Sequence, residues 1–251
     1  MATCQVASAL SDPAVLAHHL VSAEGREPEA WALVLHGIFG LGANFRSVAR
    51  KLVERRPEWG MVLVDLRAHG ESQGLSPPHD LAAVVRDLDA LSAHLGRPVQ
   101  GLIGHSFGGK VALAYLEQHP GVMKLACVLD SMPGPRRVTG DDVVSRVLAD
   151  LEAIPQPIAS REAFHAHMTS RGYAKGIVDW LAMNVRRDGD AYRLRLDLPA
   201  IRLMLDDYWA RDLWRSRVPK RRARGTRAWS SRHWRMPATG CTPTTPRGCW
   251  R

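Results

Sequence analysis

Residues 101–116 read GLIGHSFGGKVALAYL, and this stretch decides the fold expected for the chain. The apolar run before it, residues 98–103, has the length and residue types of a buried strand. The run stops at residues 104–109 (GHSFGG), and residues 110–118 are helix formers with apolar side chains at 111, 113 and 116. Glycine at 104 and 108 lets the backbone bend tightly, so Ser106 is expected to project its hydroxyl from a sharp strand-to-helix turn.

Two further motifs lie upstream of this turn. The apolar run 31–35 ends in HGIFG (36–40), and the run 61–64 leads into DLRAHGES (65–72). A G-x-S-x-G pattern alone is weak, because it occurs by chance in roughly one chain in ten of this size. The alternative interpretation is a helix-start loop that happens to contain a serine, but three motifs in series favour a nucleophile at Ser106.

In series, the three motifs resemble those of the α/β-hydrolase superfamily, of the small serine esterase type, over about residues 14–214. The resemblance implies the α/β class: a mostly parallel, doubly wound sheet with a helical cap. It implies that Ser106 attacks the substrate and that the backbone N–H groups of Ile38 and Phe107 form an oxyanion hole.

Histidines inside the motifs are tempting general bases, but the resemblance implies that they brace the turns: His36, His69 and His105. Seven others have no motif context and are expected on the surface or in loops: His18, His19, His79, His94, His119, His165 and His167.

The acid of a catalytic triad has one candidate. The strand-like run 125–129 is followed directly by Asp130. The carboxyl ends of the strands in a doubly wound sheet meet at the ligand crevice, so Asp130 is expected at the same edge as Ser106. Some members of the resembled family take the acid from this strand and others from the next. Alternatively, Asp130 caps the following turn.

Length and composition limit the size of the fold, the expected location and the expected cofactors. A chain of 251 residues is long enough for one α/β core with a small excursion. Four cysteines without paired spacing suggest a reducing compartment, so a cytoplasmic location is expected, with Cys127 as a small apolar core residue. The N-terminal segment has neither a basic start nor a long apolar run, which argues against a signal peptide and a membrane span. No metal or organic cofactor is expected.

The net charge of +9 is concentrated at one end. Residues 215–251 contain 11 of the 34 lysines and arginines and none of the 25 acidic residues, which leaves the rest with 23 basic and 25 acidic side chains. Because the body is near neutral, no nucleic-acid partner is expected. The expected partner is a small-molecule ester, and the sequence does not fix the oligomeric state.

We divide the chain into a hydrolase core (1–134), a helical cap with its return to the core (135–214) and an irregular basic tail (215–251). Helical segments are predicted from Asp141 and Asp142 to Leu151, from Ser160, over 176–185 and over 199–213. Apolar residues of the cap are candidates for its inner face, although plain core packing explains them too: Phe164, Ile177, Trp180, Leu181, Met204 and Tyr208.

The sequence pattern of the tail (215–251) does not fit the rest of the expected fold. It has no strand alternation and no helical period, and the last two strands and catalytic histidine that the resemblance implies are not visible. When codons for residues 236–250 (MPATGCTPTTPRGCW) are regrouped after the first two bases, permitted choices spell AGHWVHTDDPEGLL. GHWVH resembles the family's catalytic-histidine segment, so we interpret the tail as read out of frame.

The sequence therefore predicts a serine hydrolase of carboxylic esters that is impaired by loss of its histidine. His233, the only histidine of the tail, is a weak substitute because no strand positions it. Loss of the last strands should also expose the edge beside residues 125–129 and lower solubility. Two alternatives remain: a thioesterase or C–C lyase on the same scaffold, and a non-catalytic ligand or nucleic-acid binder that uses the basic tail.

Overall fold

The computed structural model describes residues 15–137 and 142–214, which all belong to one compact unit (residues 1–218). The tail, 215–251, lies outside the described residues, and so does Asp141. The strands and helices of the core, in chain order, are β1 (His18–Val21), β2 (Ala30–Leu35), α1 (Arg46–Arg55), β3 (Trp59–Val64), α2 (Leu81–Leu95), β4 (Val99–His105), α3 (Phe107–Gln118) and β5 (Leu125–Leu129).

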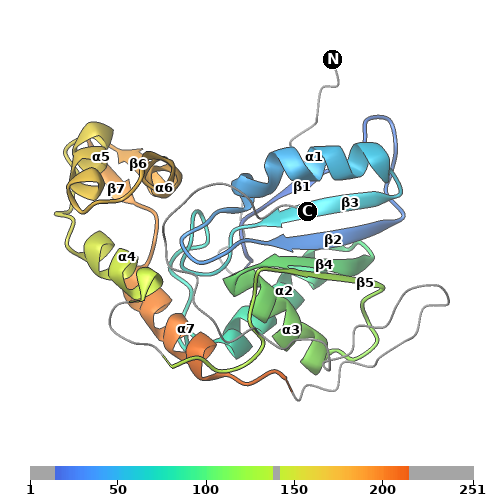
Figure 1. Ribbon diagram of the computed structural model, residues 1–251. Coiled ribbons are helices and arrows are strands. Elements are labelled where there is room, and N and C mark those ends of the chain that lie inside the picture. The colour runs from blue at the N-terminus through green and yellow to red at the C-terminus, as the bar shows by residue number, and fades with distance from the viewer. Residues whose placement is uncertain (1–14, 138–141, 215–251) are drawn as a thin grey trace, which may run out of the picture. The chain divides into compact units, whose positions relative to one another are not determined.

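Five strands form the central sheet in the order β1-β3-β2-β4-β5. Strand β2 is parallel to both β3 and β4, and β4 is parallel to β5, whereas β1 is antiparallel to β3. Helix α1 lies on one face of the sheet and helices α2 and α3 lie on the other (Figure 1). The predicted α/β fold with a mostly parallel, doubly wound sheet is confirmed.

Burial of both faces explains why the central strands read as continuous apolar runs. All six residues of β2 are buried. Trp31, Leu33 and Leu35 pack in the core on the side of α2 and α3. Ala32 and Val34 pack with residues of α1 on the opposite side. Strands β2, β3 and β4 thus match the runs predicted at 31–35, 61–64 and 98–103, with ends differing by at most two residues.

Strand β1 was not predicted. Its sequence, HHLV, has no apolar run, and it is a strand because it pairs with β3 from His18 opposite Val64 to Val21 opposite Met61. The expectation that His18 and His19 are surface or loop residues is therefore wrong. Both are half-buried, and burial lowers the pKa of His18.

The segment after β5 forms the cap, whose elements are α4 (Val143–Glu152), α5 (Arg161–Ser170), α6 (Lys175–Leu181), a 3-10 helix (Ala182–Asn184), β6 (Val185–Asp188), β7 (Ala191–Leu194) and α7 (Leu198–Ala210). Asp142 and Ser160 cap α4 and α5 by accepting hydrogen bonds from the N–H groups of Ser145 (3.0 Å) and Ala163 (3.1 Å). The predicted helix starts are thus confirmed.

The cap also contains a feature that the helical interpretation missed. Strands β6 and β7 form an antiparallel hairpin that lies almost entirely between the helical segments predicted over 176–185 and 199–213. Its two-residue turn is Gly189-Asp190, with φ of +61° at Gly189, and this Gly-Asp dipeptide is the local signal that could have revealed it. Among the inner-face candidates, Phe164, Leu181 and Met204 are fully buried, but Ile177 is exposed, so it was wrongly assigned to an inner face.

Strand β5 is the exposed edge of the sheet. Among the described residues it pairs only with β4. Leu125 and Leu129 are 40% and 42% exposed, and Cys127 is half-buried instead of lying in the core. The carboxyl end of β5 leads directly to Asp130, so the exposed edge borders the region of the candidate acid.

Candidate active site

Ser106 occupies a strained position between β4 and α3. Its φ of +51° and ψ of −116° lie outside the regions that L-residues normally adopt. The backbone is held there from two neighbouring strand ends, because Ser106 N–H donates to the Leu129 carbonyl (2.9 Å) and Gly108 N–H donates to the His36 carbonyl (3.1 Å). A Cβ atom on Gly108 would lie 2.5 Å from the Leu35 carbonyl oxygen, which explains the glycine. Strain at such a turn is typical of functional sites.

Two backbone N–H groups near this turn have no hydrogen-bond partner among the described residues: those of Ile38 and Phe107. Phe107 is the first residue of α3, so its N–H lies ahead of the helix's own hydrogen bonds. The loop of Ile38 passes beside Ser106, since a Cβ atom built on Gly37 would lie 3.2 Å from the Cβ of Ser106. The structure thus brings together the serine and the loop that the sequence paired with it.

His36 and His69 are fixed structural residues. His36 Nε2 accepts from Leu66 N–H (3.0 Å) and His69 Nε2 accepts from Phe39 N–H (3.1 Å). Each Nδ1 therefore carries the proton and donates to a backbone carbonyl, Gly37 for His36 (2.8 Å) and Arg67 for His69 (2.9 Å). The prediction that these two histidines brace turns is confirmed.

Both rings are held neutral by their surroundings. The side chains are 1% and 0% exposed, and burial lowers the pKa of His36 to about 4 and that of His69 to about 3. Protonation would also turn each Nε2 from an acceptor into a donor facing a backbone N–H. Because both nitrogens of each ring are engaged with backbone groups, neither imidazole is free to accept the proton of Ser106.

No base accompanies the serine within the described residues. The Ser106 side chain makes no capping hydrogen bond, and no described histidine is hydrogen-bonded to its hydroxyl. His105 precedes it in β4, half-buried, with its ring 6.2 Å from that of Phe45. His233 lies outside the described residues.

Asp130 lies at the end of β5 with φ of +47° and is exposed. It follows Leu129, whose carbonyl binds the Ser106 N–H, so the predicted position at the same sheet edge is the one observed. The next residue, Ser131, has a buried hydroxyl without a hydrogen-bond partner.

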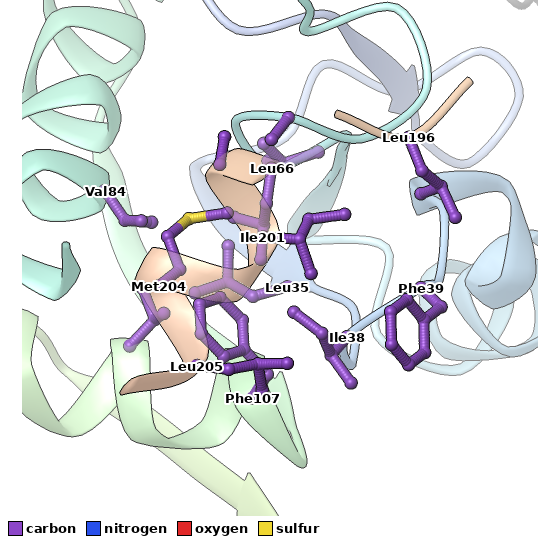
Figure 2. Packing of buried hydrophobic residues seen from close by; sticks show 14 of the residues in the cluster. Leu35, Ile38, Phe39, Leu66, Val84, Phe107, Leu196, Ile201, Met204 and Leu205 are labelled. Atoms are coloured by element: carbon purple, nitrogen blue, oxygen red, sulfur yellow. The ribbon is translucent and has the colours of Figure 1, made fainter. Parts of the chain in front are cut away.

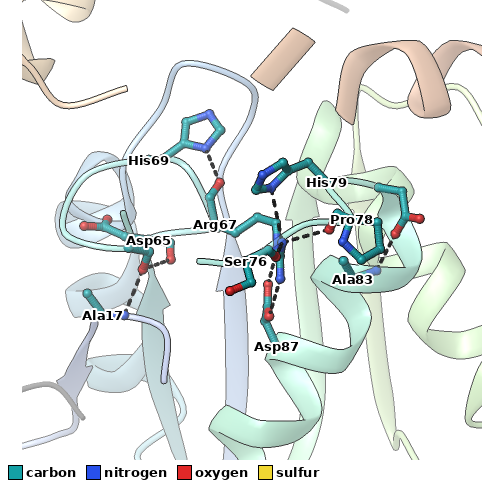
Figure 3. Close-up of polar contacts among 11 residues, drawn as sticks. Ala17, Asp65, Arg67, His69, Ser76, Pro78, His79, Ala83 and Asp87 are labelled. Atoms are coloured by element: carbon teal, nitrogen blue, oxygen red, sulfur yellow. Dashed lines mark hydrogen bonds and ion pairs between the residues drawn. The ribbon is translucent and has the colours of Figure 1, made fainter. Parts of the chain in front are cut away.

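The DLRAHGES motif (65–72) makes hydrogen bonds that hold the surrounding loops in place. Asp65 Oδ1 accepts from Gly42 N–H (2.8 Å), and burial raises the pKa of this carboxyl group. Arg67 forms a two-bond ion pair with Asp87 of α2 (2.6 and 2.8 Å), and it also donates to the carbonyls of Ser76 and Pro78 (Figure 3). These contacts give Asp65 and Arg67 of the motif structural roles.

Apolar side chains of the cap pack in the same cluster as those of the motif loops. Leu196 and Leu205 of the cap belong to the buried cluster that contains Ile38, Phe39 and Phe107 (Figure 2). The ring of Tyr208 lies 5.6 Å from that of Phe107. Side chains from both the motif loops and the cap therefore line the same region.

From the sequence, no role was predicted for two polar residues of this region, Lys110 and Asn184. Lys110 of α3 is 1% exposed, and its Nζ donates to the carbonyls of Gly134 (2.9 Å) and Tyr208, where the chain leaves the core and returns to it. Burial lowers the pKa of Lys110 to about 8. Asn184 of the cap donates from Nδ2 to the Phe39 carbonyl (2.8 Å). No local sequence signal marks either one, because their partners are distant along the chain.

The described ranges contain no group of three or more histidine, cysteine, aspartate or glutamate side chains that could hold a metal ion. None of their helices combines the length and apolar character needed to cross a membrane.

Comparison with known proteins assigns the family. Residues 32–219 match the alpha/beta hydrolase fold family, and the chain belongs to it. The chain is 30% identical over 199 residues to the sn-1-specific diacylglycerol lipase ABHD11 of Mus musculus, which covers 77% of this chain and 63% of that protein. Its counterpart in Danio rerio is 28% identical over 190 residues, or 73% and 58% of the two chains. The chain thus spans about three fifths of the length of these curated relatives.

Solved structures agree with this assignment. A marine microorganism esterase superposes with a TM-score of 0.69 at 25% identity, covering 78% of this chain and 74% of the other. E-2-(acetamidomethylene)succinate hydrolase gives a TM-score of 0.62 at 19% identity over 83% and 75% of the chains, which supports the fold alone. The chain is a member of the α/β-hydrolase family, and proteins similar to it are named as a lipase and an esterase.

Proposed function

We propose that this chain is a serine hydrolase that cleaves carboxylic esters through an acyl-enzyme on Ser106. The observation that carries the proposal is the strained turn at Ser106, with φ of +51°, beside two unpartnered amides. A positive φ at a serine costs on the order of 1–3 kcal/mol. Such a cost is understandable where the turn holds a nucleophile against hydrogen-bond donors.

In the proposed reaction, Ser106 Oγ attacks the ester carbonyl carbon as a base takes its proton. The Ile38 and Phe107 N–H groups then bind the carbonyl oxygen, which becomes negative in the tetrahedral intermediate. The alcohol leaves with a proton, and water hydrolyses the acyl-enzyme by the same route. Asp130, at the adjoining strand end, is the candidate for orienting the base.

The relatives support the substrate class. The curated relatives are named as diacylglycerol lipases, and the structural neighbour at 25% identity is named as an esterase. The apolar cap side chains around Phe107, including Tyr208 and Leu205, suit an acyl chain. We propose esters of modest acyl length as substrates.

The missing element is the base. Since both buried histidines are engaged with backbone groups, we propose that the chain is slow because no imidazole accepts the Ser106 proton. A serine hydroxyl at its ordinary pKa is a weak nucleophile, and loss of one triad member leaves only residual acceleration from the oxyanion hole and binding.

Added imidazole tests the proposal. Hydrolysis of p-nitrophenyl butyrate by the purified chain is followed with increasing imidazole, with Ser106→Ala as the matched control because imidazole itself cleaves this ester. We expect slow hydrolysis that rises with imidazole in the wild-type chain and no rise above background in Ser106→Ala. Equal rates for the two chains at every imidazole concentration would contradict a role for Ser106.

A further inference from the structure

The loop that carries the Ile38 N–H is held at the next residue from both sides. Phe39 has a φ of +61°, which is unusual for a bulky side chain. Its N–H donates to Nε2 of His69 in the core (3.1 Å), and its carbonyl accepts from Nδ2 of Asn184 in the cap (2.8 Å). His69 and Asn184 thus hold the two peptide groups that flank this strained residue.

Asn184 is buried at a cost. The residue is 1% exposed, and its Nδ2 also donates to the Leu181 carbonyl (3.3 Å), whereas its Oδ1 is buried without a partner. An unpartnered buried acceptor destabilises the folded chain, because it loses its hydrogen bonds to water. A leucine of the same shape would avoid that cost, so packing alone does not explain the asparagine. The hydrogen bond from its Nδ2 to the Phe39 carbonyl does explain it.

The cap segment is itself well anchored. The Asn184 carbonyl accepts from Arg195 N–H (2.8 Å), and the neighbouring Met183 sulfur accepts from Asn44 Nδ2 (3.2 Å), at the end of the same core loop. Leu196 and Phe39 belong to the same cluster of buried apolar side chains (Figure 2). The Phe39 carbonyl is therefore bound by a donor whose own position is fixed.

We propose that Asn184 is a positioning residue of the oxyanion hole. By fixing the Phe39 carbonyl, it fixes the strained backbone at Phe39 and thereby the direction of the adjoining Ile38 N–H. The hole is then assembled jointly by the core and the cap. This inference rests on the proposed function, in which the Ile38 N–H binds the oxyanion.

A boronic acid tests this role without requiring turnover. Butaneboronic acid forms a bond from Ser106 Oγ to boron, and as the hydroxyl proton passes to the buffer the adduct becomes a negatively charged tetrahedral boronate. Its affinity for the full chain is measured by ¹¹B NMR. The affinity of 2-hexanone, a planar carbonyl compound with the same alkyl chain, is measured by ligand-observed NMR.

The variants separate positioning from general loosening of the cap. Asn184→Asp removes the donor with little change of shape, and Asn184→Leu does so without adding charge, so that the test survives if one of them fails to fold. Asp207→Leu is the matched control, because it removes a different cap-to-core hydrogen bond, which Asp207 Oδ2 accepts from Leu81 N–H (2.9 Å). Ser106→Ala reports adduct formation.

We expect the Asn184 variants to weaken boronate binding by about tenfold or more, part of the effect of removing an oxyanion donor, and to leave 2-hexanone within about twofold. Unchanged boronate affinity in the Asn184 variants would overturn the inference, and so would an equal loss for Asp207→Leu or for 2-hexanone. If the wild-type chain forms no tetrahedral adduct, the proposed function itself fails, and this inference fails with it.

Discussion

Strands β2 and β5 belong to the same parallel sheet, yet their environments are opposite. Every residue of β2 is buried between α1 on one face and α2 and α3 on the other, whereas β5 has Leu125 and Leu129 at least 40% exposed. The end of β2 leads to the tightly bonded loop of Ile38, and the end of β5 leads to the exposed Asp130. The side of the proposed site that holds the proposed nucleophile Ser106 (the nucleophile side) is therefore preorganised, and the side that holds the proposed acid Asp130 (the acid side) is not.

The largest change in the rate of ester hydrolysis should come from restoring the catalytic-histidine segment. We expect the coding DNA between codons 205 and 251 to contain one inserted or deleted base, and correction of the frame to supply the GHWVH segment. Hydrolysis of p-nitrophenyl butyrate should then rise by about a thousandfold or more, the usual effect of completing a triad. Restored-frame Ser106→Ala is the control. An intact frame, or ordinary esterase rates in the present chain, would refute the interpretation.

Matched truncations on the two strands test the difference in burial. Leu33 of β2 is 0% exposed and Leu129 of β5 is 42% exposed. Leu33→Ala should lower the free energy of unfolding by about 3 kcal/mol, the usual cost of a core cavity. Leu129→Ala should lower it by less than about 1 kcal/mol. Urea denaturation measures both, and similar losses for the two variants would show that β5 is covered in solution.

A fall in pH should lower the stability of the nucleophile side, which contains His36 and His69, before that of the acid side. Burial lowers the pKa of His36 to about 4 and that of His69 to about 3, below the unfolded value of 6.5. Between these values the unfolded chain binds protons that the folded chain does not, so stability falls as pH falls below about 6.5. The loss is about 1.4 kcal/mol per pH unit for each histidine.

Urea denaturation at several pH values between 7 and 5 measures this slope. His69→Gln, although less stable at pH 7, should show a shallower dependence on pH than the wild-type chain. Leu33→Ala, which destabilises the core without removing a titratable group, provides the control, since its slope should match that of the wild-type chain. A steep slope retained in His69→Gln would exclude this histidine as its source.

The smallest change in stability should come from charging the β5 edge. Leu125→Lys and Leu129→Lys introduce cations at positions already 40% and 42% exposed, so the free energy of unfolding should change by less than about 0.5 kcal/mol. Self-association should nevertheless decrease, because charged edge strands resist pairing with other chains. Light scattering against concentration measures it. Lys substitution at Val48, an exposed site on α1, should leave self-association unchanged.

The same contrast explains how much the sequence could predict. Strands β2, β3 and β4 were found because burial on both faces requires unbroken apolar runs, and Asp142 and Ser160 marked helix starts by local capping chemistry. Strand β1 exists through its pairing with β3, and the hairpin β6–β7 is short and largely exposed, so neither produced a pattern. Ser106 and the loop of Ile38 could be paired from motifs. Asn184 could not, since its contact spans 145 positions.

Lys110 gives the cap an unusual kind of attachment. Lys110 follows Ser106 by about one turn of α3, and its ammonium group binds the carbonyl of Gly134, where the chain leaves the core, and that of Tyr208, where it returns. Both ends of a segment of more than seventy residues are thus fastened to one side chain. A segment of another length and sequence could therefore be joined to the same core if its two ends still meet at this lysine and if it still supplies a donor to the Phe39 carbonyl.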